Sequence, residues 1–165
     1  MKRLVVILML LVCVTILSAQ EVDWLWAINS GGVSSDYAQC IAVDSEGNCY
    51  VTGYFRFTAT FGSTTLTGKG DKDIFIAKAD KDGNWLWAKK AGEGRDDEGF
   101  GIAVDSEGNC YVTGYIALTE VDAGYADIFI AKFDKDGNWL WLKMVGDWFD
   151  DLVSASPSTA KAAAM

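Results

Sequence analysis

An all-β fold made of repeated four-stranded antiparallel sheets is predicted by three features of this 165-residue chain. Short apolar runs rich in Val, Ile, Tyr, Phe and Trp alternate with turns rich in Asp, Asn and Gly, which is typical of strands. Long stretches of sequence occur twice, and nothing beyond the N-terminal segment shows the 3.6-residue apolar period of a helix. The chain has 17 Gly and one Pro, so we expect many tight turns.

The N-terminal segment is typical of a secretory signal peptide, predicted at 1–19. Lys2 and Arg3 precede an apolar run at 4–17, which at 14 residues is shorter than the roughly 20 that a membrane-spanning helix needs. A lipoprotein would have Cys where Gln20 stands. We therefore predict cleavage after Ala19 and export to the periplasm, cell surface or medium, without lipidation and without a membrane span after cleavage. A retained anchor is the alternative interpretation.

Two sequence blocks recur. IAVDSEGNCYVTGY occupies 41–54 and again 102–115, which is 61 positions later. DIFIAKADKDGNWLW at 73–87 returns at 127–141, 54 positions later, with one change in 15. The two spacings differ because the first copy carries an extra segment at about 55–70. Repeats of this length indicate stacked supersecondary units.

Each unit is predicted to be a four-stranded meander. The first unit holds apolar runs at 41–43, 49–54, 74–79 and 85–88, and turns of the form Asp-x-(Asp/Glu)-Gly-Asn join them. Four such antiparallel strands form one blade of a β-propeller, and the repeated blades form the propeller. We expect a signal peptide at 1–19, a repeat region at 20–150 with blade one at about 38–91, blade two at about 99–146 and an extra N-terminal strand at about 22–28, and a low-complexity tail at 151–165.

The sequence resembles a known family at GIAVDSEGNCYVTGY (101–115), which follows Asp97 and precedes a DIFIAK strand. These features resemble the SBBP repeat of exported bacterial β-propeller proteins, and the resemblance extends from residue 24 to about 150. It implies a propeller fold and an exported protein, often with many tandem copies and a C-terminal sorting domain, but no particular activity. Cys49 and Cys110 depart from the aliphatic residues more usual in the family, and the chain ends in small residues rather than in a sorting domain.

The number of blades predicts an incomplete ring. Two blades fall short of the four or so that close a propeller. The WLW element at 24–26 matches the fourth strand of a blade without its first three, and in closed propellers such a strand commonly completes the last blade. We expect each end of the blade pair to expose an apolar face, through which the chain self-associates despite its charge, because salt screens charge over about 8 Å.

The charge and the residue types present exclude several functions. The chain has 23 acidic and 14 basic residues, for a net charge of −9, and loss of Lys2 and Arg3 makes it −11. This charge excludes nucleic acid and anionic membranes as partners. The absence of His from the sequence excludes His-based triads and imidazole ligands. No cofactor is predicted.

Three cysteines remain after the predicted cleavage. If the turn between Cys40 and Cys49 spans 44–48, Val43 lies opposite Cys49 and Cys40 lies opposite Thr52. That offset is unfavourable for a disulfide, whose Cβ atoms lie about 4 Å apart. We predict that Cys40, Cys49 and Cys110 are buried thiols.

The acidic turns at 44–48, 80–84, 105–109 and 134–138 resemble part of a calcium loop. An EF-hand loop spreads its ligands over about 12 residues and ends in a bidentate Glu, whereas these acidic residues lie within five. Hairpin-turn hydrogen bonding is therefore the favoured interpretation. The calcium candidates of the alternative are Asp80, Asp82, Asn84, Asp134, Asp136 and Asn138.

Other carboxylates and the paired tryptophans are candidates for a ligand site. Asp36, Asp97 and Asp151 recur at repeat spacing, as do Asp73 and Asp127, but copied residues favour a structural role over a single catalytic pair. Tryptophans two apart on a strand share a face and could stack on a sugar, although burial against a neighbouring blade is favoured. The ligand candidates are Trp85, Trp87, Trp139, Trp141 and, in the most charged loop, Arg95, Asp96 and Asp97.

The sequence thus predicts an exported propeller-repeat protein that serves as a binding or structural module, with a protein or glycan at the cell surface as partner. A polysaccharide hydrolase or lyase is the alternative. The favoured interpretation is a protein that is not an enzyme, because no nucleophile–base pair stands out.

Overall fold

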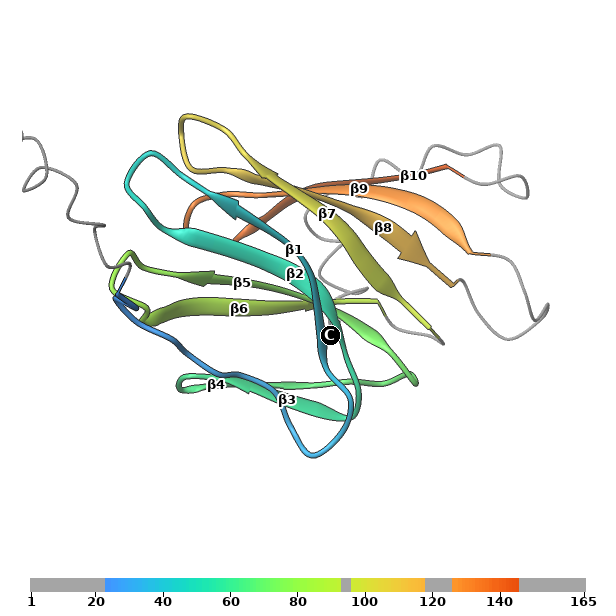
Figure 1. The fold of residues 1–165 in the computed structure, drawn as a ribbon. Helices are drawn as coiled ribbons and strands as arrows, with labels where there is room; N and C mark the ends of the chain where they lie inside the picture. Colours follow the sequence, from blue (N-terminus) through green and yellow to red (C-terminus); the bar gives the residue numbers. More distant parts are fainter. Residues whose placement is uncertain (1–22, 93–95, 118–125, 146–165) are drawn as a thin grey trace, which may run out of the picture.

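The structure is a computed structural model that describes residues 23–92, 96–117 and 126–145. These residues form ten β-strands and no helix, which confirms the all-β prediction (Figure 1). Within the same ranges, no helix has the length and apolar character needed to cross a membrane.

The first sheet has the strand order β1-β2-β5-β6, with every neighbouring pair antiparallel. Its strands are β1 (Tyr37–Val43), β2 (Cys49–Phe55), β5 (Asp73–Ala79) and β6 (Trp85–Ala91). Spatial order follows chain order, so the predicted meander forms. Val43 pairs with Cys49 and Cys40 with Thr52, which is the predicted register.

The second sheet repeats the first. It has the order β10-β9-β8-β7 and consists of β7 (Glu98–Val104), β8 (Cys110–Ile116), β9 (Asp127–Phe133) and β10 (Trp139–Val145). Val104 pairs with Cys110 as Val43 pairs with Cys49. The identical sequence blocks therefore form equivalent strands in two tandem blades of an open, unclosed propeller.

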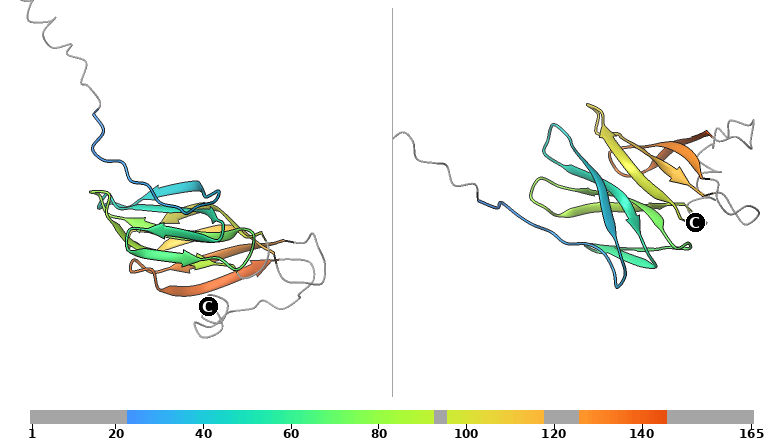
Figure 2. Two further views of the ribbon diagram at one scale, coloured as in Figure 1. Left: turned by 90° about the horizontal axis from the view of Figure 1, so that it is seen from below. Right: turned by 45° about the vertical axis from the view of Figure 1, so that its right-hand side comes forward.

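The two sheets pack face to face (Figures 1 and 2). We call the face of a sheet that looks along the chain direction, towards the next blade, its back face, and the opposite face its front face. The back face of the first sheet packs on the front face of the second, and β7 lies against β1 and β2. The back face of the first sheet includes Tyr50, Thr52, Ile74, Ile76, Lys78, Trp87 and Ala91, and the front face of the second includes Cys110, Val112, Ile116, Phe129, Ala131, Phe133 and Leu142.

One glycine permits the close approach of the sheets. A Cβ atom on Gly99 in β7 would lie 2.3 Å from Thr52 Oγ1 and 3.1 Å from Ile74 Cγ2. The Thr52 side chain is fully buried there, and its hydroxyl donates a hydrogen bond to the Phe75 carbonyl at 2.9 Å.

A hairpin that the sequence did not reveal covers part of the front face of the first sheet. Strands β3 (Thr58–Phe61) and β4 (Thr64–Thr67) form in the extra segment of the first repeat. Phe61 and Leu66 of the hairpin are buried against Phe55 and Phe75. The expectation that both ends of the blade pair are bare is therefore wrong for the part of this end that the hairpin covers, whereas Ile41 and Val43 on the same face are 60% and 58% exposed.

The extra N-terminal strand predicted at about 22–28 does not form in the described residues. Residues 23–30 are assigned to no strand, and the nearest pairing is an isolated bridge between Gly31 and Thr60. A fourth strand needs the free edge of a third, and both described sheets already hold four strands. Residues 23–30 instead run on the same side of the first sheet as the hairpin (Figure 1).

Candidate functional site

The four acidic turns share one set of hydrogen bonds. In the first, Asp44 Oδ1 accepts from the backbone N–H groups of Glu46 and Asn48 at 3.0 and 2.9 Å, and Asp44 Oδ2 accepts from Asn48 Nδ2 at 2.9 Å. The turn glycine Gly47 has φ +86°, a conformation that favours glycine. The same hydrogen bonds recur around Asp80, Asp105 and Asp134. Hairpin-turn hydrogen bonding is therefore what these carboxylates do.

These hydrogen bonds favour the charged form of the turn carboxylates. The Asn109 side-chain amide, with backbone N–H groups, lowers the pKa of Asp105 to about 2. The Asn84 amide lowers the pKa of Asp80 in the same way. Burial raises the pKa of Asp44, but the hydrogen bonds from Asn48 outweigh burial, so the net direction is downward.

The calcium candidates lie in these turns, but their oxygens point to protein partners. Asp80 accepts from Asn84, whereas both Asp82 oxygens contact Lys81 Nζ at 2.9 and 3.0 Å. Asp134, Asn138 and Asp136 repeat the arrangement, with Lys135 as the cation. Over the ranges that the structure describes, no three Cys, Asp or Glu side chains gather as a metal site would require.

The carboxylates that recur between strands also bind backbone amides. Asp36 accepts from the N–H groups of Gly32 and Arg56 at 2.7 and 3.2 Å. Asp73 is fully buried, accepts from two loop N–H groups and pairs with Lys90 Nζ at 3.2 Å. Asp127 is half-buried at the start of β9. Asp151 lies outside the described residues.

The described part of the charged loop, Asp96 to Glu98, makes contacts within the protein. Asp97 is fully buried, and its Oδ1 accepts from the Ala117 N–H at 2.8 Å. The backbone of Asp96 forms an isolated parallel β-bridge with that of Lys72. The Lys72 side chain forms an ion pair with Glu98. Arg95 lies outside the described residues.

Three of the four tryptophan candidates pack in the core. Trp85 contacts Phe61 edge-on at 5.1 Å, and Trp139 contacts Phe133 at 4.7 Å between ring centroids. Trp87 packs between the sheets against Tyr50. These contacts support the core interpretation over the sugar platform, whereas Trp141 is half-buried on the back face of the second sheet.

The prediction of three buried thiols is right only for Cys110, which is fully buried. Cys40 and Cys49 are half-buried, and Cys49 lies on the front face of the first sheet, of which only part is covered. Burial raises the pKa of Cys110 to about 12. All three are free thiols.

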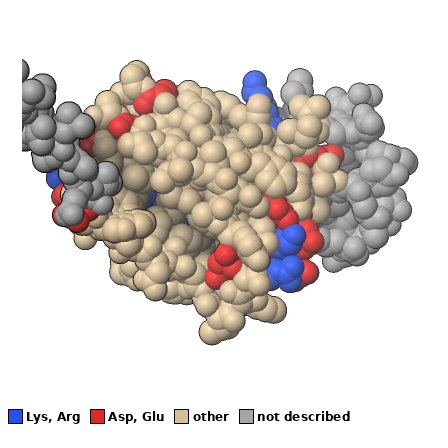
Figure 3. All heavy atoms as spheres, in the orientation of Figure 1, with Lys and Arg blue, Asp and Glu red and all other residues tan. Residues whose placement is uncertain are grey.

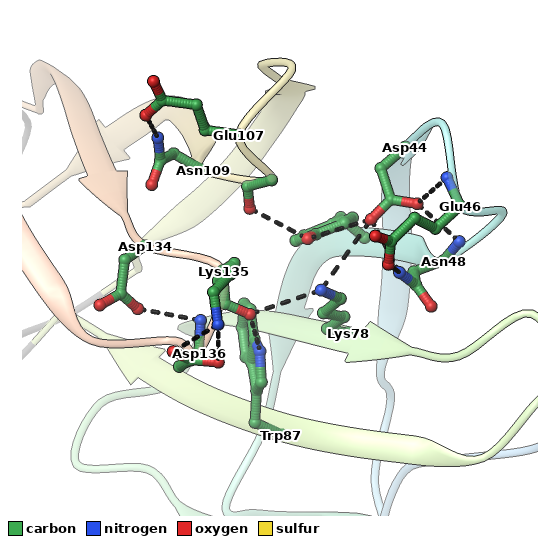
Figure 4. A network of polar contacts seen from close by, with 12 residues as sticks. Asp44, Glu46, Asn48, Lys78, Trp87, Glu107, Asn109, Asp134, Lys135 and Asp136 are labelled. Carbon is green, nitrogen blue, oxygen red and sulfur yellow. Dashed lines mark hydrogen bonds and ion pairs between the residues drawn. The ribbon is translucent and has the colours of Figure 1, made fainter.

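A polar network joins the sheets where the turns of the second meet the back face of the first (Figure 4). Trp87 Nε1 and Lys78 Nζ both donate to the Lys135 carbonyl, at 3.1 and 3.4 Å. The Tyr50 hydroxyl donates to the Gly108 carbonyl at 3.0 Å. Three donors on one blade thus recognise two turn carbonyls on the next, and burial raises the pKa of Tyr50, which keeps its hydroxyl protonated.

The back face of the second sheet carries the same donors without such a partner among the described residues. Tyr111, Lys132 and Trp141 stand where Tyr50, Lys78 and Trp87 stand in the first sheet. The difference in burial is large: Ile74 and Ile76 are 0% exposed, whereas their equivalents Ile128 and Ile130 are 61% and 47% exposed. Six of its residues are identical in type to those of the first sheet: Tyr111, Thr113, Ile128, Ile130, Lys132 and Trp141. Val145 stands where the first sheet has Ala91. This surface is the candidate interaction site.

The front face of the first sheet is hollowed beside the N-terminal segment. A largely apolar hollow of about 430 Å³ is lined by Trp26, Ile41, Cys49, Val51 and Ala79, among others. A more polar groove of about 760 Å³ lies next to it, along residues 27–32 and Asp36. On the side of the molecule seen in Figure 3, uncharged atoms predominate and charged side chains gather in small groups.

Comparison with known proteins agrees with this architecture. Residues 86–116 match the family model described as SBBP, beta-propeller repeat, and this span runs from β6 through β8. An uncharacterised WD repeat-containing protein of Acanthamoeba polyphaga mimivirus is 32% identical over 155 residues, which covers 71% of this chain. The chain spans 11% of that relative. The two equivalent blades and the matched span show that the chain is a β-propeller-repeat protein, with an SBBP-type repeat at residues 86–116.

Proposed function

We propose that this protein is an exported binding or structural module, located at the cell surface or outside the cell, that acts through the open faces of its blade pair. The observation that carries the proposal is the back face of the second sheet, where Ile128 is 61% exposed although its equivalent Ile74 is fully buried. An apolar face of this kind, with hydrogen-bond donors among its side chains, is typical of a protein interaction surface.

The recurring carboxylates support a non-catalytic role. Asp36, Asp44, Asp80 and Asp105 each accept hydrogen bonds from nearby backbone N–H groups, which is the same structural task in successive repeats. A catalytic pair would instead need two carboxyl groups with different environments. A glycan array, followed by product analysis on every bound glycan, tests this point. Cleavage of a bound polysaccharide would contradict the proposal and favour a hydrolase or lyase.

Export is tested by the N-terminus of the protein recovered from expressing bacteria. Mass spectrometry of the periplasmic and extracellular fractions should find a chain that begins at Gln20, because small residues precede it and an apolar run precedes those. An intact chain that begins at Met1 and fractionates with membranes would contradict export of the processed form.

A further inference from the structure

We propose that the back face of the second sheet binds the front face of the first sheet in a second copy of this chain, and that Trp141 of one copy takes the position that Trp26 holds in the other. This inference rests on the proposed function and names the partner. Three observations carry it: the contact between the two blades, the position of Trp26, and the six residues that the two back faces share.

The contact between the blades shows what a back face binds. Trp87 Nε1 donates to the Lys135 carbonyl at 3.1 Å, and its indole lies over the turn glycine Gly137. A Cβ atom on Gly137 would lie 2.8 Å from Trp87 Cδ2, so only glycine allows the ring this close. The second blade therefore presents a turn carbonyl and a bare glycine to an indole of the first blade.

Trp26 makes the same contact with the first blade. Its Nε1 donates to the Lys81 carbonyl at 2.8 Å, and a Cβ atom on Gly83 would lie 2.9 Å from Trp26 Cδ2. Lys81 and Gly83 are the equivalents of Lys135 and Gly137. The N-terminal segment thus occupies the docking position for a preceding blade, and it does so with the β3–β4 hairpin in place.

The second sheet carries the side chains needed to fill that position. Trp141, Lys132 and Tyr111 repeat the three donors, and Gly47 and Lys81 of a second copy repeat the two acceptor carbonyls of Gly108 and Lys135. Within the described residues, the Trp141 indole N–H has no hydrogen-bond acceptor, and its ring packs edge-on against Tyr111 at 6.2 Å. Ile41 and Val43 on the receiving front face are 60% and 58% exposed.

The front and back surfaces differ, so this contact is heterologous and joins copies head to tail. Trp26 of the receiving copy must leave its position first, which lowers the apparent affinity. The β3–β4 hairpin also covers Phe75, Ala77 and Ala88, so the contact is confined to the part of the front face that the hairpin leaves open, around Ile41 and Val43 and the turns at Gly47 and Lys81.

Three residues also depart from the internal contact: Ala38, Ala79 and Ala88 stand where Gly99, Phe133 and Leu142 stand in the second blade. Of these, Ala38 adds a methyl group, and a Cβ atom at Gly99 would lie 2.3 Å from Thr52 Oγ1. We therefore expect association weaker than the internal packing, and strengthened by Ala38→Gly.

The test is sedimentation velocity of the exported chain and its variants over a micromolar concentration range. Trp141→Ala should weaken association at least about tenfold, because an indole that fills such a position is a typical hot spot. Trp26→Ala should strengthen it about fivefold, because it removes the competing hydrogen bond and ring. Trp24→Ala is the matched control in the same segment, since Trp24 is 89% exposed, and should change nothing.

A mixing experiment tests the head-to-tail arrangement. Ile41→Asp blocks the front face at an exposed position and leaves the back face intact, whereas Trp141→Ala blocks the back face. Each variant alone should associate at least about tenfold more weakly than the parent chain. An equimolar mixture of the two variants should form a one-to-one dimer, because the intact back face of Ile41→Asp meets the intact front face of Trp141→Ala. Normal association of Ile41→Asp alone would show that two back faces pair, and would overturn the proposal.

The remaining outcomes separate this inference from the proposed function. If the parent chain associates and neither Trp141→Ala nor Trp26→Ala changes that association, this interface is overturned, although the protein still self-associates through another surface. If the parent chain is exported with Gln20 at its N-terminus but the parent chain and every variant are monomeric, self-association is overturned and export stands. Melting curves show whether each variant is folded.

Discussion

Single residues decide how closely the two blades pack. Gly99 is required because the space for a side chain is already occupied by the buried Thr52 hydroxyl. At the equivalent position Ala38 carries a methyl group that meets no second blade. The residue type at this position therefore depends on whether another blade lies in front of it.

Gly99→Ala is expected to lower the free energy of unfolding by about 1–3 kcal/mol, because a methyl group 2.3 Å from Thr52 Oγ1 forces the sheets apart. Urea denaturation followed by tryptophan fluorescence measures the change. Gly101→Ala is the control, since its nearest neighbour would be Thr113 Cγ2 at 3.1 Å, and it should cost less. Equal losses in the two variants would contradict this account of the packing.

The cysteines are expected to react with thiol reagents in an order that follows their burial. Cys40 and Cys49 are half-buried and should be labelled in the folded protein, whereas Cys110 is fully buried with a pKa of about 12 and should be labelled only after unfolding. Peptide mapping after timed alkylation measures the order. Early labelling of Cys110 would show that the sheets separate readily.

At the scale of elements, the strands could be predicted from the sequence more fully than the segments between them. The repeat blocks gave the register, as the pairing of Val43 with Cys49 shows, because apolar alternation and turn residues determine it locally. The β3–β4 hairpin was missed because its strands are only four residues long and rich in Thr, and together they hold only three apolar residues, Ala59, Phe61 and Leu66. The N-terminal strand was wrongly expected because a strand depends on a partner edge that no local pattern reveals.

The candidate site could be predicted only in part. The paired tryptophans were recognised as candidates, but identical WLW elements have different surroundings: Trp87 is covered by the second blade, and Trp141 is not. The sequence alone cannot show which of two identical WLW elements is buried, because their burial depends on whether another blade packs against them. The one available signal was the 61-residue spacing of Trp26 and Trp87, since equivalent positions share equivalent contacts.

The acidic turns are expected to make stability sensitive to strong acid. The pKa of Asp105 is lowered from 3.8 to about 2 in the folded protein, so its charged form favours folding above pH 3.8, and this contribution is lost as the pH falls towards 2. Asn109→Ala removes the largest cause of the shift and should raise the pKa of Asp105 towards 3.8. Carboxyl-carbon NMR titration measures it. A pKa that stays near 2 in the variant would contradict the role of Asn109.

At the scale of the whole molecule, the blade pair is covered unequally at its two ends. The hairpin and Trp26 cover part of one end, and the back face of the second sheet remains open among the described residues. The internal repeat provides a matched comparison, because the same isoleucine is fully buried in one blade and exposed in the other.

Ile74→Lys and Ile128→Lys make the same chemical change at equivalent positions. Ile74→Lys should cost more than about 4 kcal/mol, because it buries an unpaired charge at a position that is 0% exposed. Ile128→Lys should change the free energy of unfolding by less than about 0.5 kcal/mol, since the position is 61% exposed. Thermal and urea denaturation at low protein concentration measure both. A large loss for Ile128→Lys would show that residues outside the described ranges cover this face.

The two matching back faces also bear on how such a chain could lengthen. The second blade fits the first through six residues that it repeats on its own far side, so a duplicate of residues 96–145 placed after the original would meet a surface already suited to it. Val145, which stands where the buried Ala91 stands in the first blade, is the contact residue that differs. Gene duplication could therefore add blades one at a time, each addition being compatible with folding as soon as it arose.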